Sequence, residues 1–264
     1  MVPHFVRMRP VFALGLVVAL AAGAAAGTVS NAIFRIEATN ADGSGFLEFY
    51  ANELVYNGST NAWDWNKGVT EILNGSGDTI AVLDSATMSL MIDPTPDKPY
   101  RINLGFAVHA GSSLTGFAIR SAMITFSGTL DPNMLQSPAG GGRATASLGI
   151  TDENGNGATL LAVGQTGIGA YRAHYNGWYP GGTVFSTLVN MVSAGPGGSG
   201  SGGQSYPSGS GYQSINVATS DMSAGLGFTL TAADSASGTT SYRILPEHAA
   251  LGLAALGLLL GRRR

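Results

Sequence analysis

The sequence predicts an all-β fold, an antiparallel β-sandwich or jelly roll, for the body of this 264-residue chain. Apolar and polar residues alternate with a period of two in several segments, as in strands with one buried face. Turn-forming pairs such as Asn-Gly and Asp-Gly separate these segments. About a dozen short strands joined by such turns, without a strong amphipathic helix, are typical of a sandwich.

The clearest alternation lies at 101–109, where Ile102, Leu104, Phe106 and Val108 form the apolar set. The same pattern predicts further strands at 33–39, 86–92, 143–150 and 226–231, and residues 241–245 are expected to form the final strand before the tail.

Two segments depart from plain alternation. Phe46–Tyr50 is partly apolar on both faces, so we expect a more buried strand there. Thr183–Val192 also fits helical spacing, but its β-branched residues favour a strand.

The segment 195–211 (GPGGSGSGGQSYPSGSG) has too few apolar residues for a core, so we expect a flexible surface loop. Only 34 residues separate this segment from Pro246, too few for an independent domain without disulfides or metal. Residues 27–245 are therefore predicted to form a single domain.

Composition limits the functions that this body can have. The chain contains 39 glycines, 44% apolar residues and no cysteine, so disulfides and thiol catalysis are excluded and an ordinary core is expected. Residues 27–245 carry 8 basic side chains against 15 acidic ones, a net charge of −7. A body of this sign does not favour nucleic acid as a partner.

The N-terminus has the features of a secretory signal peptide over residues 1–26. Arg7 and Arg9 precede the apolar run 11–20, and Ala24 and Ala26 occupy the −3 and −1 positions of an A-x-A site for signal peptidase. The alternative is a membrane anchor, but ten apolar residues span only about 15 Å as a helix, half of a bilayer core. The sequence therefore predicts an exported protein, cleaved after Ala26, with Ser30-Asn31-Ala32 as the alternative site.

The C-terminal tail, 246–264, combines a short apolar helix with a basic end. Residues 249–261 carry no charge and span about 20 Å as a helix, too short for a comfortable lifelong anchor. Arg262, Arg263 and Arg264 follow, and the positive-inside rule keeps them on the cytoplasmic side. The tail is expected to hold the protein in the inner membrane transiently.

Pro246 and Glu247, followed by the Leu/Ala/Gly helix and the arginine cluster, resemble the PEP-CTERM sorting tail of certain bacteria. His248 stands where that family has its second proline. The resemblance implies processing by an exosortase-like transpeptidase and delivery to the cell surface or extracellular space. Two alternatives remain, a permanent tail anchor and a sortase signal of the LPxTG type.

Asp152, Asn154 and Asn156 place oxygen ligands at alternate positions before Gly157, like the first half of a calcium-binding loop. The twelfth position is Val163 instead of glutamate. A polar hairpin turn explains the same residues.

Trp63, Trp65 and Trp178 are candidates for stacking against sugar rings if they lie exposed on the sandwich. The alternative is that they fill the core or anchor loops.

No catalytic constellation is recognisable, so we expect a protein that is not an enzyme and that has no cofactor, calcium being the one candidate. Before the tail, residues 27–245 hold only His109 and His174, and no G-x-S-x-G motif occurs. The expected function is a structural or adhesive role at the cell surface or in the extracellular matrix. The alternatives are a carbohydrate-binding module, with extracellular polysaccharide as partner, and a secreted hydrolase.

Overall fold

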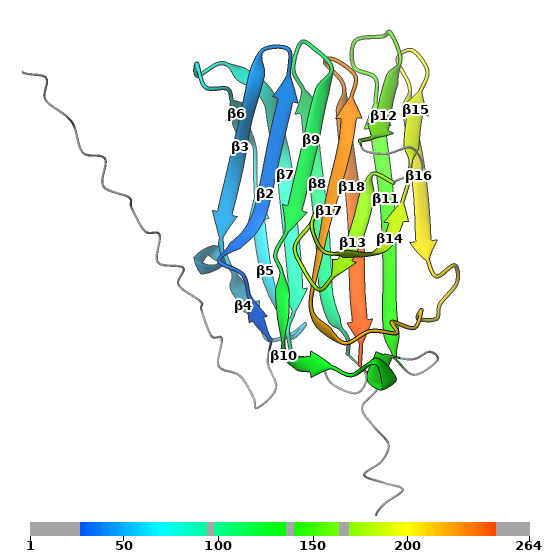
Figure 1. Cartoon of the computed structure of the whole chain (residues 1–264). Helices are drawn as coiled ribbons and strands as arrows, with labels where there is room; N and C mark the ends of the chain where they lie inside the picture. The colour runs from blue at the N-terminus through cyan, green and yellow to red at the C-terminus, as the bar shows by residue number, and fades with distance from the viewer. Residues whose placement is uncertain (1–26, 94–97, 136–139, 164–168, 247–264) are drawn as a thin grey trace, which may run out of the picture.

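A computed structural model of the chain shows two antiparallel β-sheets packed face to face, and it describes residues 27–93, 98–135, 140–163 and 169–246 (Figure 1). The predicted antiparallel sandwich is therefore confirmed. The predicted signal peptide and C-terminal helix lie outside the described residues. No helix within the described residues is long and apolar enough to cross a membrane.

The first sheet, sheet A, lies in front in Figure 1. Its central strand, β17, is longer than its neighbours and pairs with two of them on each side. Strands β9 and β10 lie end to end along one side, and β12 and β13 lie end to end along the other. The strands of sheet A are β1 (Thr28–Val29), β2 (Ala32–Asn40), β3 (Gly43–Tyr50), β9 (Thr115–Ser121), β10 (Ile124–Leu130), β12 (Ala158–Ala162), β13 (Tyr171–Tyr175), β14 (Thr183–Leu188), β15 (Met191–Ala194) and the central β17 (Thr219–Leu230).

The second sheet, sheet B, has the order β16-β11-β18-β8-β7-β5-β4, and β6 also pairs with β7. Its strands are β4 (Val55–Asn57), β5 (Ala62–Lys67), β6 (Thr70–Leu73), β7 (Thr79–Met91), β8 (Tyr100–Ala110), β11 (Gly141–Thr151), β16 (Ser199–Tyr206) and β18 (Ser235–Leu245). Two short 3₁₀ helices, η1 (Ala51–Glu53) and η2 (Pro132–Leu135), lie in connections.

One hydrophobic core lies between the sheets and extends along the chain from Val29 to Ile244. In β8 every second residue from Tyr100 to Ala110 is buried, including the apolar set that the alternation predicts. The residues between them face solvent on the outer side of sheet B. Residues 183–192 are largely strand as expected, divided between β14 and β15 by Val189, which has a φ of 56°.

The expectation of a buried strand at 46–50 is wrong. This segment belongs to β3, which among the described strands of sheet A pairs with β2 alone, so it forms an edge. Phe46 is 56% exposed and Tyr50 is 42% exposed. The guanidinium of Arg35 lies 4.1 Å from the centre of the Phe46 ring, so this outward aromatic residue stacks with a cation instead of entering the core.

The prediction of a surface loop over 195–211 is wrong for Ser199–Tyr206. These eight residues form β16, and each of them is paired with a residue of β11. Inward-facing Gly200 lies so close to the backbone of Ser193 in the neighbouring sheet that a Cβ atom would not fit. The glycines therefore allow the edges of the two sheets to approach closely. Backbone hydrogen bonds to β11 stabilise the strand, although it buries few apolar side chains.

Candidate functional site: a hydroxyl-lined trough on sheet B

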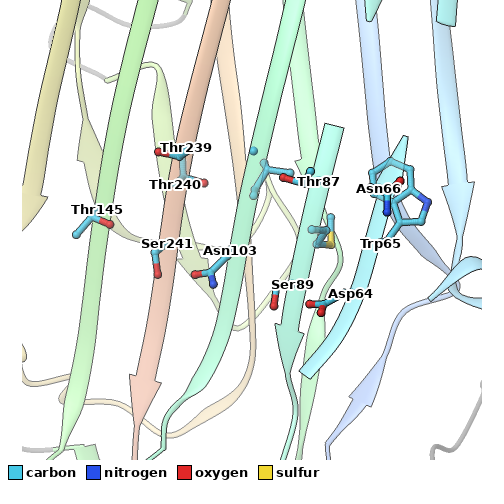
Figure 2. A pocket seen from close by; sticks show the side chains of 13 residues that line it. Asp64, Trp65, Asn66, Thr87, Ser89, Asn103, Thr145, Thr239, Thr240 and Ser241 are labelled. Carbon is cyan, nitrogen blue, oxygen red and sulfur yellow. The ribbon is translucent and has the colours of Figure 1, made fainter. Parts of the chain in front are cut away.

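The outer face of sheet B presents rows of small polar side chains, because outward residues on neighbouring antiparallel strands lie opposite one another. The first row consists of Thr145, Ser241, Asn103, Ser89 and Asp64. The second row consists of Ser147, Thr239, Gly105, Thr87 and Asn66. The third row consists of Gly149, Ser237, Ala107 and Ser85. We call the surface formed by these three rows the hydroxyl face, and Figure 2 shows the first row in line across its strands.

Three adjoining hollows of about 510, 460 and 380 Å³ lie on this face. The first and second share Thr87, Gly105 and Thr239. The second and third share three further residues, Ala107, Gly149 and Ser237. Shared walls make the hollows one continuous trough along the middle of sheet B.

Small residues keep this trough open. Gly105 and Ala107 of β8 and Gly149 of β11 carry little or no side chain where longer residues would fill the space. A Cβ atom at Gly105 would lie 2.5 Å from Oγ1 of Thr87, so the Thr87 side chain would have to move to admit one. The trough floor is thus largely backbone, and its walls are hydroxyl and amide groups.

Hydrogen bonding is the chemistry that these walls offer. A serine or threonine hydroxyl both donates and accepts, and the Asn66 and Asn103 amides do the same through two different atoms. Neighbouring groups in a row lie about 4.8 Å apart, and successive rows lie about 6.7 Å apart along the strands. A regular array of this kind can bind an extended polymer that carries hydroxyl or amide groups at short intervals.

One end of the trough is acidic. Asp84, His109 and Glu153 line the third hollow, and Nδ1 of His109 lies 3.5 Å from Oε2 of Glu153. Burial raises the pKa of Asp84 above its ordinary value, His109 lowers it, and Glu153 raises it further. This cluster gives no signal in the sequence, because its members come from three different segments of the chain that are brought together by β7, β8 and the end of β11.

The structure does not bring the three candidate tryptophans together on one surface. Trp65 is only 4% exposed, and its ring packs 5.2 Å from Phe34 and 4.9 Å from Phe49, measured between ring centres. Its indole N–H donates to Oε2 of Glu53. Trp65 is therefore a core residue, and its assignment to sugar stacking is wrong because its faces are covered.

Trp63 and Trp178 are half-buried. Trp63 packs against the core and lies 5.1 Å from the Tyr56 ring. Trp178, in the connection between β13 and β14, lines a separate hollow of about 170 Å³ on the sheet A side. That hollow is also lined by Arg35, Glu48 and Arg120.

Asp152, Asn154 and Asn156 form a turn whose side chains hydrogen-bond within the turn and to two other loops. The buried Asp152 carboxylate accepts backbone N–H groups from Gly155, Gly157 and Gly197. Oδ1 of Asn154 accepts the backbone N–H of Asn156, and its amide donates to the carbonyl of Ala232. Three backbone N–H donors therefore surround the Asp152 carboxylate, and they stabilise its negative charge. The three residues thus act as the polar hairpin turn that was the alternative to a calcium loop. No group of three or more His, Asp or Glu side chains within the described residues is placed to hold a metal ion.

The export and sorting residues fall mostly outside the described part of the chain. Ala24, Ala26, Glu247, His248 and the cluster Arg262–Arg264 are not among the described residues. Pro246 is described, and it is buried directly after the end of β18.

Comparison with known proteins identifies no relative. No protein-family model matches the sequence, and no curated protein matches it. One solved structure, a mutant VP2 protein of infectious bursal disease virus in T=1 particles, aligns at 7% identity with a TM-score of 0.09. The alignment covers 85% of this chain and 65% of that chain, and at this score the likeness supports no conclusion about fold or function.

Proposed function

We propose that this chain is an exported surface protein with a structural or adhesive role, and that it adheres to extracellular polysaccharide through the trough of the hydroxyl face. The continuous trough walled by hydroxyl and amide groups is the observation on which this proposal rests. Polysaccharides present hydroxyl groups at regular intervals, which is the chemistry that these walls complement.

The proposed route to the surface follows from the two ends of the sequence. Signal peptidase removes residues 1–26 after Ala26, and an exosortase-like transpeptidase processes the tail near Pro246. Both cuts would leave the sandwich whole. Gly27 donates its N–H to the carbonyl of Ile92 and β1 begins at Thr28, while β18 ends at Leu245.

Intact mass of the protein released by its natural host tests this route. The expected mature chain starts at Gly27 and lacks Arg262, Arg263 and Arg264. A variant with Ala26→Trp should accumulate unprocessed, because signal peptidase accepts only small residues at that position. Recovery of a firmly membrane-bound protein that still ends in Arg264 would contradict the proposed processing.

Polymer binding tests the adhesive part. Ser147→Leu together with Thr239→Leu places two bulky groups without hydroxyls in the trough while keeping residues that β-strands tolerate. Affinity electrophoresis against a panel of neutral and acidic polysaccharides should show binding by the natural protein. The double variant should bind at least about tenfold more weakly, a loss of about 1.4 kcal/mol.

Thr39→Leu is the matched control, since Thr39 is exposed on β2 of the opposite sheet. It should leave polymer binding unchanged. Equal binding by the trough variant and the natural protein would place the binding surface elsewhere.

A second candidate site would bind a sugar on the sheet A side. The observation that favours it is the hollow between Trp178 and Arg120, where the buried indole nitrogen has no hydrogen-bond partner among the described residues. An aromatic ring beside charged donors is a common arrangement for a small polar ligand. Loss of polymer binding in a Trp178→Ala variant would favour this site over the trough.

A further inference from the structure

Three arginines stand side by side at one end of the hydroxyl face. Arg143 of β11 lies opposite Arg243 of β18, and Arg243 lies opposite Arg101 of β8. Neighbouring strands are about 4.8 Å apart, so three positive charges share a short row. Each arginine alternates with buried neighbours along its strand, so all three side chains belong to the outer face. We call Arg101, Arg143 and Arg243 the arginine row.

The arginine row is electrostatically unfavourable within the protein itself. Like charges directly opposite on neighbouring strands destabilise a sheet. None of the ion pairs among the described residues involves any of the three arginines. Burial lowers the pKa of Arg101, Arg243 lowers it further, and Asp64 raises it. Nε of Arg101 is buried and makes no hydrogen bond within the described part of the chain.

The row also runs against the charge of the rest of the sandwich. Residues 27–245 contain only 8 basic residues against 15 acidic ones, and three of those eight stand in this row. Three of eight basic residues in one row of an acidic protein indicate that positive charge is required at this place. The overall charge of the surface does not account for their clustering.

The trough and the arginine row are continuous. Thr145, Ser241 and Asn103 line the first hollow, and each stands two residues along its strand from one of the arginines, on the same face. A polymer chain lying along the hydroxyl face would therefore reach the row. The far end of the trough carries Asp84 and Glu153, which would repel an acidic group. The hollow next to the arginine row carries one acidic residue, Asp64, beside three arginines, so the positive charge dominates at that end.

We propose that the arginine row binds the acidic groups of an anionic polysaccharide, either uronate carboxylates or sulfate esters. This inference rests on the proposed function of the trough and names the class of polymer that it takes. A guanidinium matches both groups, because its planar fork donates two parallel hydrogen bonds to a pair of oxygens. The bound anion would remove the repulsion between the three arginines.

Anionic lipid is the rival partner. Leu245 is two residues beyond Arg243, so the row lies at the end of the sandwich where β18 leaves the fold, the lower end in Figure 1. The observations favour the polymer because the row extends a trough, and a lipid headgroup would not use the hydroxyl groups along that trough.

The test compares four probes: polygalacturonate for carboxylates, dextran sulfate for sulfate esters, dextran as a neutral polymer, and phosphatidylglycerol vesicles. The variant carries Arg101→Gln, Arg143→Gln and Arg243→Gln, and Arg172→Gln on β13 of sheet A is the control that removes one arginine outside the row. We expect the triple variant to bind the acidic polymers at least about tenfold more weakly and with little of the natural salt dependence. Binding of dextran, where it occurs, should not change.

Thermal unfolding of the triple variant shows whether it is folded. Removing three like charges should leave its thermal stability unchanged or raise it. Binding of polygalacturonate identifies carboxylates as ligands, and binding of dextran sulfate alone identifies sulfate. If the triple variant binds acidic polymers normally while the Ser147→Leu/Thr239→Leu variant does not, this inference fails and the proposed function stands. Vesicle binding through the arginines without polymer binding would overturn it in favour of lipid. Failure of the natural protein to bind any polymer would overturn both.

Discussion

The carboxylate of Asp152 accepts the backbone N–H of Gly197, so one side chain joins the turn after β11 to the turn before β16. The same carboxylate also accepts N–H groups from Gly155 and Gly157. Burial raises the pKa of Asp152, but these hydrogen bonds to the charged form outweigh burial, and the net pKa lies below the ordinary value of 3.8. The residue that resembles a calcium ligand in sequence therefore stabilises two turns as an anion.

Asp152→Asn should lower the thermal unfolding midpoint by several degrees, because an amide nitrogen would face backbone donors. A carboxyl with a depressed pKa stabilises the fold above its ordinary pKa, and this stability is lost as the pH falls through the folded value. In strong acid Asp152 should therefore contribute little to the stability of the natural protein. The unfolding midpoints of the natural protein and of Asp152→Asn should become equal there.

Thermal unfolding with and without calcium tests whether Asp152 belongs to a polar turn or to a metal site. Calcium or a chelator should leave the unfolding midpoint of the natural protein unchanged. Asp42→Asn, at an exposed turn, is the control and should unfold like the natural protein. A midpoint that rises with calcium and no longer does so in Asp152→Asn would restore the metal assignment.

Gly225→Ala should destabilise the protein by about 1–3 kcal/mol, since the added methyl group would collide with the ring of Tyr179. Tyr179 lies across the outer side of β17, and a Cβ atom at Gly225 would stand 2.6 Å from its ring. Gly128→Ala in β10 is the matched control, because a Cβ atom there meets nothing within 4 Å. Urea unfolding should show a change of no more than about 0.5 kcal/mol for the control. Equal stability of the two variants would mean that Tyr179 does not cover β17 in solution.

His174 should make the protein less stable in mild acid. His174 is 1% exposed, and its Nδ1 lies 3.0 Å from the carbonyl oxygen of Gly182. Burial lowers the pKa of His174 below its ordinary value of 6.5, the carbonyl raises it, and Arg172 lowers it. The unfolded chain thus binds a proton at a higher pH than the folded protein does. Stability is complete above pH 6.5 and falls as the pH drops from there towards the folded pKa.

Urea unfolding between about pH 8 and pH 5 measures this dependence. His174→Gln should show a shallower loss of stability over that range, whatever its stability at pH 8. His109→Gln is the control, because His109 lies on the outer face of sheet B. An unchanged pH dependence in His174→Gln would assign the acid sensitivity to another group.

The strands could be predicted from the sequence because alternation reports directly on which face is buried. The signal was reliable in β8, where buried and outward residues alternate along the whole strand. It failed at Phe46, because an aromatic side chain at a sheet edge can stack on Arg35 in solvent. It failed again at Ser199–Tyr206, because an edge strand that pairs through its backbone needs no apolar side chains.

The candidate site could not be predicted, because its residue types carry no signal individually. Thr145, Asn103 and Ser241 are ordinary outward strand residues, and only the pairing of β11, β18 and β8 makes them one row. The arginine row has the same origin. The sequence instead indicates the large aromatic residues as candidates, and of these Trp65 is part of the core.

Removing the tryptophans distinguishes the trough from the aromatic candidates as the surface that binds polysaccharide. Trp65→Ala should cost about 3–5 kcal/mol in urea unfolding, since it leaves a large cavity beside Phe34 and Phe49. Trp178→Ala should cost less, because that side chain is half-buried, and it should bind polysaccharide as the natural protein does. Binding by Trp65→Ala should fall only in proportion to the unfolded fraction, which the same unfolding curve supplies. Folded Trp178→Ala that no longer binds polymer would move the adhesive surface from sheet B to the hollow beside Arg120.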